Sequence, residues 1–172
     1  MARNVEIKAR IHDLKYCVSK AERLSGAEPE IIRQEDTFFN CENGRLKLRI
    51  LSKDNGVLIF YNRPDATGPK TSEYYISSTH EPDRLLDVLE RSYGSCGKVK
   101  KTRKLYMIGR TRVHLDQVEN LGSFLEFEVV LKDGADITEG EIEANQLMKE
   151  FNISETDLLS GAYVDMMQNN LS

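Results

Sequence analysis

Residues 44–49 read Gly-Arg-Leu-Lys-Leu-Arg, and residues 124–128 read Phe-Leu-Glu-Phe-Glu. Both runs alternate charged and apolar residues, which is the period of a β-strand with one charged face and one apolar face. The charged face is entirely basic in the first run and entirely acidic in the second. Like charges in a row repel unless a counter-charge covers them. The two runs together predict a surface or cavity that holds a polyanion on one side and metal ions on the other.

The simpler interpretation is that both are solvated outer faces of amphipathic strands, as is common in antiparallel sheets. An ordinary solvated face mixes the two signs, however, because neighbouring opposite charges attract. A single one-signed strand is weak evidence for a site. The recurrence of the pattern in both signs favours the binding interpretation.

Length and composition restrict the remaining alternatives. The 172 residues fit one domain spanning residues 1–172, and the net charge of −4 with 30% charged residues gives no overall basic field. We therefore expect no nucleic-acid partner. The longest apolar run, residues 57–61, is too short to span a membrane, and no signal peptide opens the chain, so a cytoplasmic protein without a membrane partner is expected.

The cysteines do not indicate a thiolate metal site or a disulfide framework. Cys17, Cys41 and Cys96 are widely spaced and form no Cys-x-x-Cys pair. Cys17 falls on the apolar face of a predicted helix, where core packing is its expected role.

Hydrophobic periodicity and turn residues divide the chain into about eight strands and four helices. The strands are expected at residues 4–11, 30–40, 45–52, 57–63, 71–78 and 123–131, with two more over 98–115 broken at Gly109. The helices are expected from the N-cap Asp13 to Gly26, over 83–93, from a capping box at 138–141 to Phe151, and from a capping box at 154–157 to about Met167.

Polar, charged faces recur on strand after strand, and the opposite faces are apolar. If helices cover the apolar faces, the charged faces point inward. A closed sheet of eight antiparallel strands has room inside for side chains or one small ligand. The sequence therefore predicts an α+β protein, an eight-stranded antiparallel β-barrel or tunnel with a charged lining and helices packed outside.

Candidate site residues are spaced by two within their strands, so each set shares a face. Buried charges in this number need partners or ligands. Arg and Lys suit a chain of phosphates, and carboxylates suit Mg²⁺ or Mn²⁺. The candidates are Glu6 and Lys8; Arg45, Lys47 and Arg49; Tyr61 and Arg63; Lys101 and Arg103; Arg112; and Glu126 and Glu128.

Several of these stretches resemble one known family. Residues 4–8, Asn-Val-Glu-Ile-Lys, resemble the amino-terminal Glu-x-Glu-x-Lys signature of the CYTH superfamily, the triphosphate tunnel metalloenzymes. Further matches, in order along nearly the whole chain, are residues 34–39, 44–49, 61–64, 99–103 and 114–128.

The resemblance implies an eight-stranded tunnel that binds a triphosphate through basic residues and a divalent metal through acidic ones. It implies metal ligands at Glu6, Glu126 and Glu128, with Asp116 as a further ligand or water-orienting group. It implies catalytic roles for Glu126, Glu128, Asp116 and Lys8. It implies phosphate binding by Lys8, Arg45, Lys47, Arg63, Lys101, Arg103 and Arg112, and either phosphate binding or bracing of the lining by Arg49, Asp36 and Tyr61.

One position departs from the signature, since Asn4 stands where its first glutamate is expected. The change removes a negative charge and keeps a neutral oxygen, so we expect weaker binding of one metal ion. His12, His80 and His114 lie on separate segments, and a metal cluster built from the three is not expected because carboxylates already supply a site for Mg²⁺ or Mn²⁺.

The family includes both hydrolases and cyclases, so three functions follow from the resemblance. The leading one is a metal-dependent hydrolase of inorganic tripolyphosphate or an organic triphosphate, acting as a monomer or homodimer. The second is a class IV adenylyl cyclase that makes cyclic AMP and pyrophosphate from ATP. The third, motivated by Asn4, is a non-catalytic triphosphate-binding module. Adenine or thiamine contacts would come from tunnel-mouth residues such as Phe38, Phe39, Tyr74 and Tyr75, which equally suit packing, so the sequence does not identify the organic group.

Overall fold

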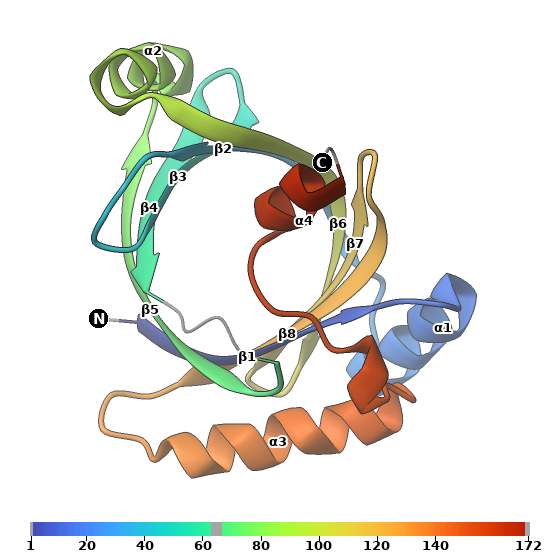
Figure 1. The fold of residues 1–172 in the computed structure, drawn as a ribbon. Helices are drawn as coiled ribbons and strands as arrows, with labels where there is room; N and C mark the ends of the chain where they lie inside the picture. Colours follow the sequence, from blue (N-terminus) through green and yellow to red (C-terminus); the bar gives the residue numbers. More distant parts are fainter. Residues whose placement is uncertain (1, 63–66, 171–172) are drawn as a thin grey trace.

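The fold is a closed barrel of eight antiparallel strands, seen along its axis in Figure 1. The computed structural model describes residues 2–62 and 67–170. The barrel order is β1-β5-β4-β3-β2-β6-β7-β8. The strands are β1 (Ala2–Arg10), β2 (Glu30–Phe39), β3 (Arg45–Ser52), β4 (Asn55–Asn62), β5 (Lys70–Thr79), β6 (Ser95–Ile108), β7 (Thr111–Val118) and β8 (Gly122–Leu131). The predicted fold class is confirmed.

Three helices pack against the outside of the barrel, and a fourth lies within its outline in Figure 1. The helical elements are α1 (Leu14–Ser25), α2 (Pro82–Tyr93), α3 (Ile137–Glu150), a short 3₁₀ helix η1 (Glu155–Asp157) and α4 (Tyr163–Asn170). Helix α3 contacts β1 and β8, α1 contacts β6 and β7, and α2 contacts β2, β3 and β4. Helix α4 contacts β6.

Strand alternation separates an apolar outer core from a charged interior. On β8, Leu125, Phe127 and Val129 are fully buried in the cluster that α3 covers, and the Phe127 ring lies 5.4 Å from that of Phe151. Glu126 and Glu128 alternate with them and point to the other face. Burying each large apolar side chain contributes about 1.5–3 kcal/mol, and this packing fixes the strand register that aims the carboxylates inward.

The ends of α1 agree with those predicted from the sequence, whereas the starts of α3 and α4 differ from the predicted ones. The side chain of Asp13 accepts a hydrogen bond from the Tyr16 amide, and Gly26 closes α1 with a φ of 69°. Helix α3 begins before the predicted capping box, because the side chain of Asp136 accepts from the Thr138 amide and acts as the N-cap.

The predicted capping box at residues 154–157 forms but does not open the last helix. It caps η1 only. The chain beyond it pairs with β1, since Leu158 bridges to Ala9 and the Leu159 amide donates to the Lys8 carbonyl oxygen. This strand-like pairing overrides the local helix signal, and α4 starts at Tyr163.

The cysteines are all free, and Cys17 lies in the core cluster under α1 as expected. In the described part of the chain, no helix has the length and apolar character needed to cross a membrane.

Candidate functional site

A cavity of about 230 Å³ lies inside the barrel and is lined by charged side chains. Ligand pockets usually measure about 300–1,000 Å³, so this cavity is a small one. Among the described lining residues, the cationic ones outnumber the acidic ones. The cationic ones are Lys8, Lys47, Arg49, Lys101, Arg103 and Arg112, and the acidic ones are Asp36, Glu126 and Glu128.

One side of the cavity, which we call the basic wall, consists of Lys47, Arg49 and Lys101 around Asp36. The Arg49 guanidinium donates two hydrogen bonds to the Asp36 carboxylate, both of 2.8 Å. The ammonium groups of Lys47 and Lys101 lie 3.5 and 3.9 Å from the same carboxylate. Asp36 is 2% exposed. A single buried carboxylate therefore faces one buried cation, Lys101, and two partly buried ones, Lys47 and Arg49, so the basic wall has surplus positive charge.

Burial and mutual repulsion lower the proton affinity of both lysines. Burial, together with the nearby guanidinium of Arg49, lowers the pKa of Lys47 to about 8. Burial and Arg103 hold the pKa of Lys101 well below its usual value. Burial opposes ionisation of Asp36 as well, but Arg49 and Lys47 outweigh it and hold the pKa of that carboxyl well below its usual range. An anion in the cavity would relieve the repulsion among these cations.

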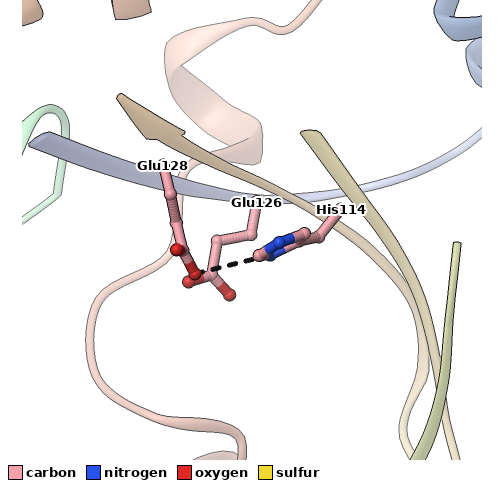
Figure 2. Close-up of side chains that lie close together, drawn as sticks. All are labelled: His114, Glu126 and Glu128. Atoms are coloured by element: carbon pink, nitrogen blue, oxygen red, sulfur yellow. Dashed lines mark ion pairs between the residues drawn. The ribbon is translucent and has the colours of Figure 1, made fainter. Parts of the chain in front are cut away.

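On the opposite side Glu126 and Glu128 of β8 line the cavity, and His114 of β7 lies beside them without being among the described lining residues; we call these three the acidic wall (Figure 2). One donor atom from each of the three side chains lies within 4.8 Å of the others, and all three residues are buried. The His114 Nδ1 atom lies 3.4 Å from Glu128 Oε1. Strand pairing produces this arrangement, because His114 is directly opposite Glu126 in the β7–β8 register.

Arginine and amide groups contact the carboxylates of Glu126 and Glu128. The Arg112 guanidinium donates to Glu128 Oε2 at 2.8 and 3.1 Å, and the Asn4 amide donates to the same oxygen at 3.4 Å. Arg103 Nη2 lies 3.6 Å from Glu126 Oε2. These contacts engage one oxygen of each carboxylate, and the Oε1 atom of Glu128 faces His114. Both carboxyl groups have a pKa below the usual value, despite burial, because the neighbouring positive groups stabilise the carboxylate form.

His114 is the site residue that the sequence interpretation missed. It is 3% exposed, and its Nδ1 atom has no hydrogen-bond partner among the described residues. Burial and the nearby Arg103 lower the pKa of His114 to about 4, so the imidazole is neutral at neutral pH. Residue spacing could have identified it, because His114 lies two residues from both Arg112 and Asp116 and therefore shares the strand face of these two predicted site residues.

Asp116 and Glu6 lie outside the cluster of potential metal ligands. Both oxygens of Asp116 accept hydrogen bonds from Arg103, at 2.7 and 2.8 Å, and the Tyr163 hydroxyl donates to one of them at 2.9 Å. Asp116 is fully buried. The Tyr74 hydroxyl donates a hydrogen bond to Glu6. In the structure Asp116 orients Arg103, and its expected role as a metal ligand or water-orienting group stays a prediction.

The C-terminal segment contributes to the site in a way that the sequence did not indicate. Ala162 and Tyr163 line the cavity. The Lys8 ammonium donates to the Gly161 carbonyl oxygen at 3.2 Å and lies 4.1 Å from the centre of the Tyr163 ring. This segment covers the lysine that the resemblance places among the phosphate ligands.

Arg45 and Arg63 complete the predicted set. Arg45 pairs through both terminal nitrogens with Asp165 of α4, at 3.1 and 2.6 Å, and it is not among the described cavity-lining residues. Arg63 lies outside the described residues. The structure brings the other predicted basic residues, Lys8, Lys47, Arg49, Lys101, Arg103 and Arg112, to the cavity.

The four expected mouth residues separate by strand alternation. Phe38 and Tyr74 line the cavity, and Tyr61 lies beside Tyr74 with ring centres 5.6 Å apart. Phe39 packs on the outer side in the cluster that includes Leu89 of α2, whereas Tyr75 is exposed. Of the four, only Phe38 and Tyr74 can therefore contact a group held in the cavity.

The donor atoms of the acidic wall fit a divalent metal ion. Carboxylate oxygen and neutral imidazole nitrogen are ordinary ligands of such ions. Glu126, Glu128 and His114 can hold one, while the basic wall lies on the other side of the same cavity. The arrangement can therefore bind an anion chain and a metal ion together.

Comparisons with known proteins agree with this geometry. The CYTH domain model matches residues 2–163. A Methanocaldococcus jannaschii protein provisionally named an adenylate cyclase is 24% identical over 94% of this chain and 97% of its own length. A Pyrococcus horikoshii structure has a TM-score of 0.81 at 20% identity, covering 94% of this chain and 98% of that one. A Hippeastrum protein, provisionally named an adenylyl cyclase and reported to have a dominant triphosphatase activity, has a TM-score of 0.65 at 14% identity, covering 94% and 91%.

Proposed function

The chain belongs to the CYTH domain family, and on that premise we propose that it is a divalent-metal-dependent hydrolase that removes the terminal phosphate of triphosphate compounds. The substrate's phosphate chain would occupy the cavity between the basic wall and the acidic wall. Its organic group, where there is one, would extend from the cavity past Phe38 and Tyr74.

The observation that carries the proposal is the surplus of buried and partly buried cations on the basic wall. The buried Lys101 and the partly buried Lys47 lie near Arg49 and share the carboxylate of Asp36 with it. Buried charge without full compensation is costly, and a polyanionic ligand would offset that cost. Arg49 and Arg103 provide planar donors for phosphate oxygens, and the lysines act as point charges.

Each wall has a separate part in the reaction. The basic wall would bind and align the phosphate chain, so that the terminal phosphorus lies toward the acidic wall. Asp116 holds Arg103 in place through its paired hydrogen bonds. A divalent ion held by Glu126 and Glu128 would neutralise charge on the phosphoryl oxygens. Water adds to the terminal phosphorus, the anhydride P–O bond breaks, and orthophosphate leaves together with the shortened chain.

A class IV adenylyl cyclase is the second candidate, supported by the name of the Methanocaldococcus jannaschii relative. In that reaction the ribose 3′-hydroxyl of ATP attacks the α-phosphorus and pyrophosphate leaves. Both reactions need the same hold on three phosphates. The products distinguish them, because a cyclase yields cyclic AMP with pyrophosphate and a hydrolase yields free orthophosphate.

One assay panel tests the proposal. The purified full chain is incubated with inorganic tripolyphosphate, thiamine triphosphate or ATP, with Mg²⁺ or Mn²⁺, across a range of pH. We expect orthophosphate release from at least one compound and its loss in a folded Glu126→Gln variant. Absence of turnover with every compound overturns the hydrolase. Cyclic AMP as the main product of ATP replaces it with the cyclase.

A further inference from the structure

We propose that His114 is a nitrogen ligand of the metal ion in this tunnel, giving a mixed imidazole and carboxylate site that prefers later first-row divalent ions to Mg²⁺. The sequence predicted an all-oxygen site built from Glu6, Glu126, Glu128 and Asp116. The new element is the nitrogen donor and the metal class that it selects. The inference concerns the same cavity as the proposed function, but direct metal binding tests it independently.

The first argument is the unsatisfied nitrogen of His114. A buried polar atom usually has a hydrogen-bond partner, and an exception calls for an explanation such as an absent ion. Nδ1 of His114 has none among the described residues, although Glu128 Oε1 lies only 3.4 Å away. In the tautomer with an unprotonated Nδ1, this atom and Glu128 Oε1 are two acceptors that a shared cation would join.

The second argument is the spacing of the donor atoms. Ligands about 2.0–2.2 Å from an ion are at most about 4.4 Å apart. The three donor atoms of His114, Glu126 and Glu128 already lie within 4.8 Å of one another. Small side-chain rotations that move these atoms by a few tenths of an ångström bring all three within bonding distance of one ion. Figure 2 shows the imidazole and the two carboxylates directed toward the same space.

The third argument is that the surroundings hold the donors in orientation. Arg112 and Asn4 donate to Glu128 Oε2, and Oε1 is directed to His114. Arg103 approaches Glu126 through one oxygen, Oε2. Such outer contacts orient metal ligands. By contrast, Glu6 accepts from Tyr74 and Asp116 accepts from Arg103 and Tyr163, so these two carboxylates have other hydrogen-bond partners.

The donor set determines the metal class. Mg²⁺ takes oxygen ligands and keeps several waters, whereas imidazole is a good ligand for Fe²⁺, Co²⁺, Ni²⁺ and Zn²⁺. Asn4 in place of the expected glutamate removes one carboxylate from the neighbourhood, which weakens the attraction for a hard ion further. The nitrogen of His114 offsets this loss only for ions that accept nitrogen.

The test measures metal binding without substrate. The full chain is freed of metal with a chelator and titrated with Co²⁺ and with Mg²⁺, following Co²⁺ absorption and its competition by Mg²⁺. Pulsed electron paramagnetic resonance of the Mn²⁺-loaded protein detects a coordinated nitrogen directly. We expect nitrogen coupling in the wild type, its loss in His114→Gln, and Co²⁺ affinity weakened about tenfold or more with Mg²⁺ affinity nearly unchanged.

Two matched variants complete the design. His80→Gln changes an exposed histidine and should leave both affinities and the nitrogen signal as in the wild type. Glu126→Gln should weaken Co²⁺ and Mg²⁺ alike. Absence of nitrogen coupling in Mn²⁺-loaded wild-type protein, or an unchanged preference for Co²⁺ in a folded His114→Gln variant, overturns the inference. Absence of triphosphatase activity alone contradicts only the proposed function.

Discussion

The basic wall and the acidic wall face the same cavity but neutralise their charges differently. On the basic wall one carboxylate, Asp36, faces three cations. On the acidic wall Arg112 pairs with Glu128, whereas Arg103 lies 3.6 Å from Glu126 and is hydrogen-bonded to Asp116, and the neutral His114 adds no charge. A strand face with charges of one sign is therefore not by itself a binding site. The positive charge that remains unpaired once all partners are known identifies the basic wall as the anion-binding side.

The largest effect is expected from breaking the acidic wall. Replacing Glu126 or Glu128 by glutamine removes a charged ligand oxygen and should lower turnover by at least about 100-fold, since even outer-contact changes cost 10- to 100-fold. Circular dichroism checks that the barrel is intact. Wild-type turnover in both variants would remove these residues from the metal site.

On the basic wall, Asp36→Asn should affect stability more than any lysine change. It leaves the buried Lys101 and the partly buried Lys47 and Arg49 without their shared carboxylate, and breaking a buried pair costs about 3–5 kcal/mol. Thermal unfolding measures the loss, and tripolyphosphate should restore much of it by supplying negative charge. The depressed pKa of Asp36 has a parallel consequence. Its stabilising effect is fully present above the ordinary carboxyl pKa and disappears as pH falls through the folded value.

If Asp36→Asn has little effect on thermal unfolding, the cations are compensated in another way and the comparison of the two walls fails. If the variant is destabilised but tripolyphosphate does not restore it, the surplus charge does not serve anion binding. The same titration with sulfate at equal ionic strength separates specific phosphate binding from general salt screening.

Lys47→Met should weaken phosphate binding while leaving the acidic wall unchanged. A charge-assisted hydrogen bond contributes about 1.5–3 kcal/mol, so calorimetry should show about 10- to 100-fold weaker tripolyphosphate binding. The matched control is Lys100→Met, on the exterior of β6 with a side chain 57% exposed. Equal losses in both variants would indicate a general electrostatic effect instead of a specific contact.

Phosphate affinity should depend on pH through Lys47. Its ammonium faces Arg49 on its own strand, Asp36 on β2, Arg103 on β6 and Glu126 on β8, and its pKa is about 8. Below this value the lysine is already charged, whereas above it phosphate binding must take up a proton. Affinity should therefore fall above pH 8, by up to about tenfold per pH unit for one proton.

Calorimetry between pH 7 and 9.5 measures this slope, and Lys47→Met supplies the reference, because part of the slope also comes from titration of the phosphate. The variant should lose the contribution of one proton. An identical pH dependence in both proteins would assign the titrating group elsewhere.

The smallest effect is expected from Asn4→Glu, which adds a carboxylate next to Glu128 on the acidic wall. The added charge should tighten Mg²⁺ binding several-fold and raise turnover, because ligand charge contributes to affinity for hard cations. Loss of the hydrogen bond from the Asn4 amide to Glu128 limits the gain. If a folded, metal-binding variant shows no gain in activity, the alternative of a binding module completed by this glutamate is contradicted.

The sequence predicted the barrel and most of its lining because strand alternation is local. Residues spaced by two share a strand face. Spacing alone therefore places Lys47 with Arg49 on one face, and Glu126 with Glu128 on another. The same rule places His114 on the face of Arg112, but it does not show that carboxylates lie opposite the histidine. The register between β7 and β8, which pairs His114 with Glu126, shows this.

What the sequence alone determined is therefore the period of each strand, the sign of each charged face and the membership of the family. Tertiary structure decided how the charges pair: Asp116 with Arg103, Arg45 with Asp165, and His114 with the two glutamates. It also placed the C-terminal segment over Lys8. The physical reason is that pairing depends on distances across the barrel between residues far apart in the chain, and barrel closure and strand register set these distances, not spacing along the chain.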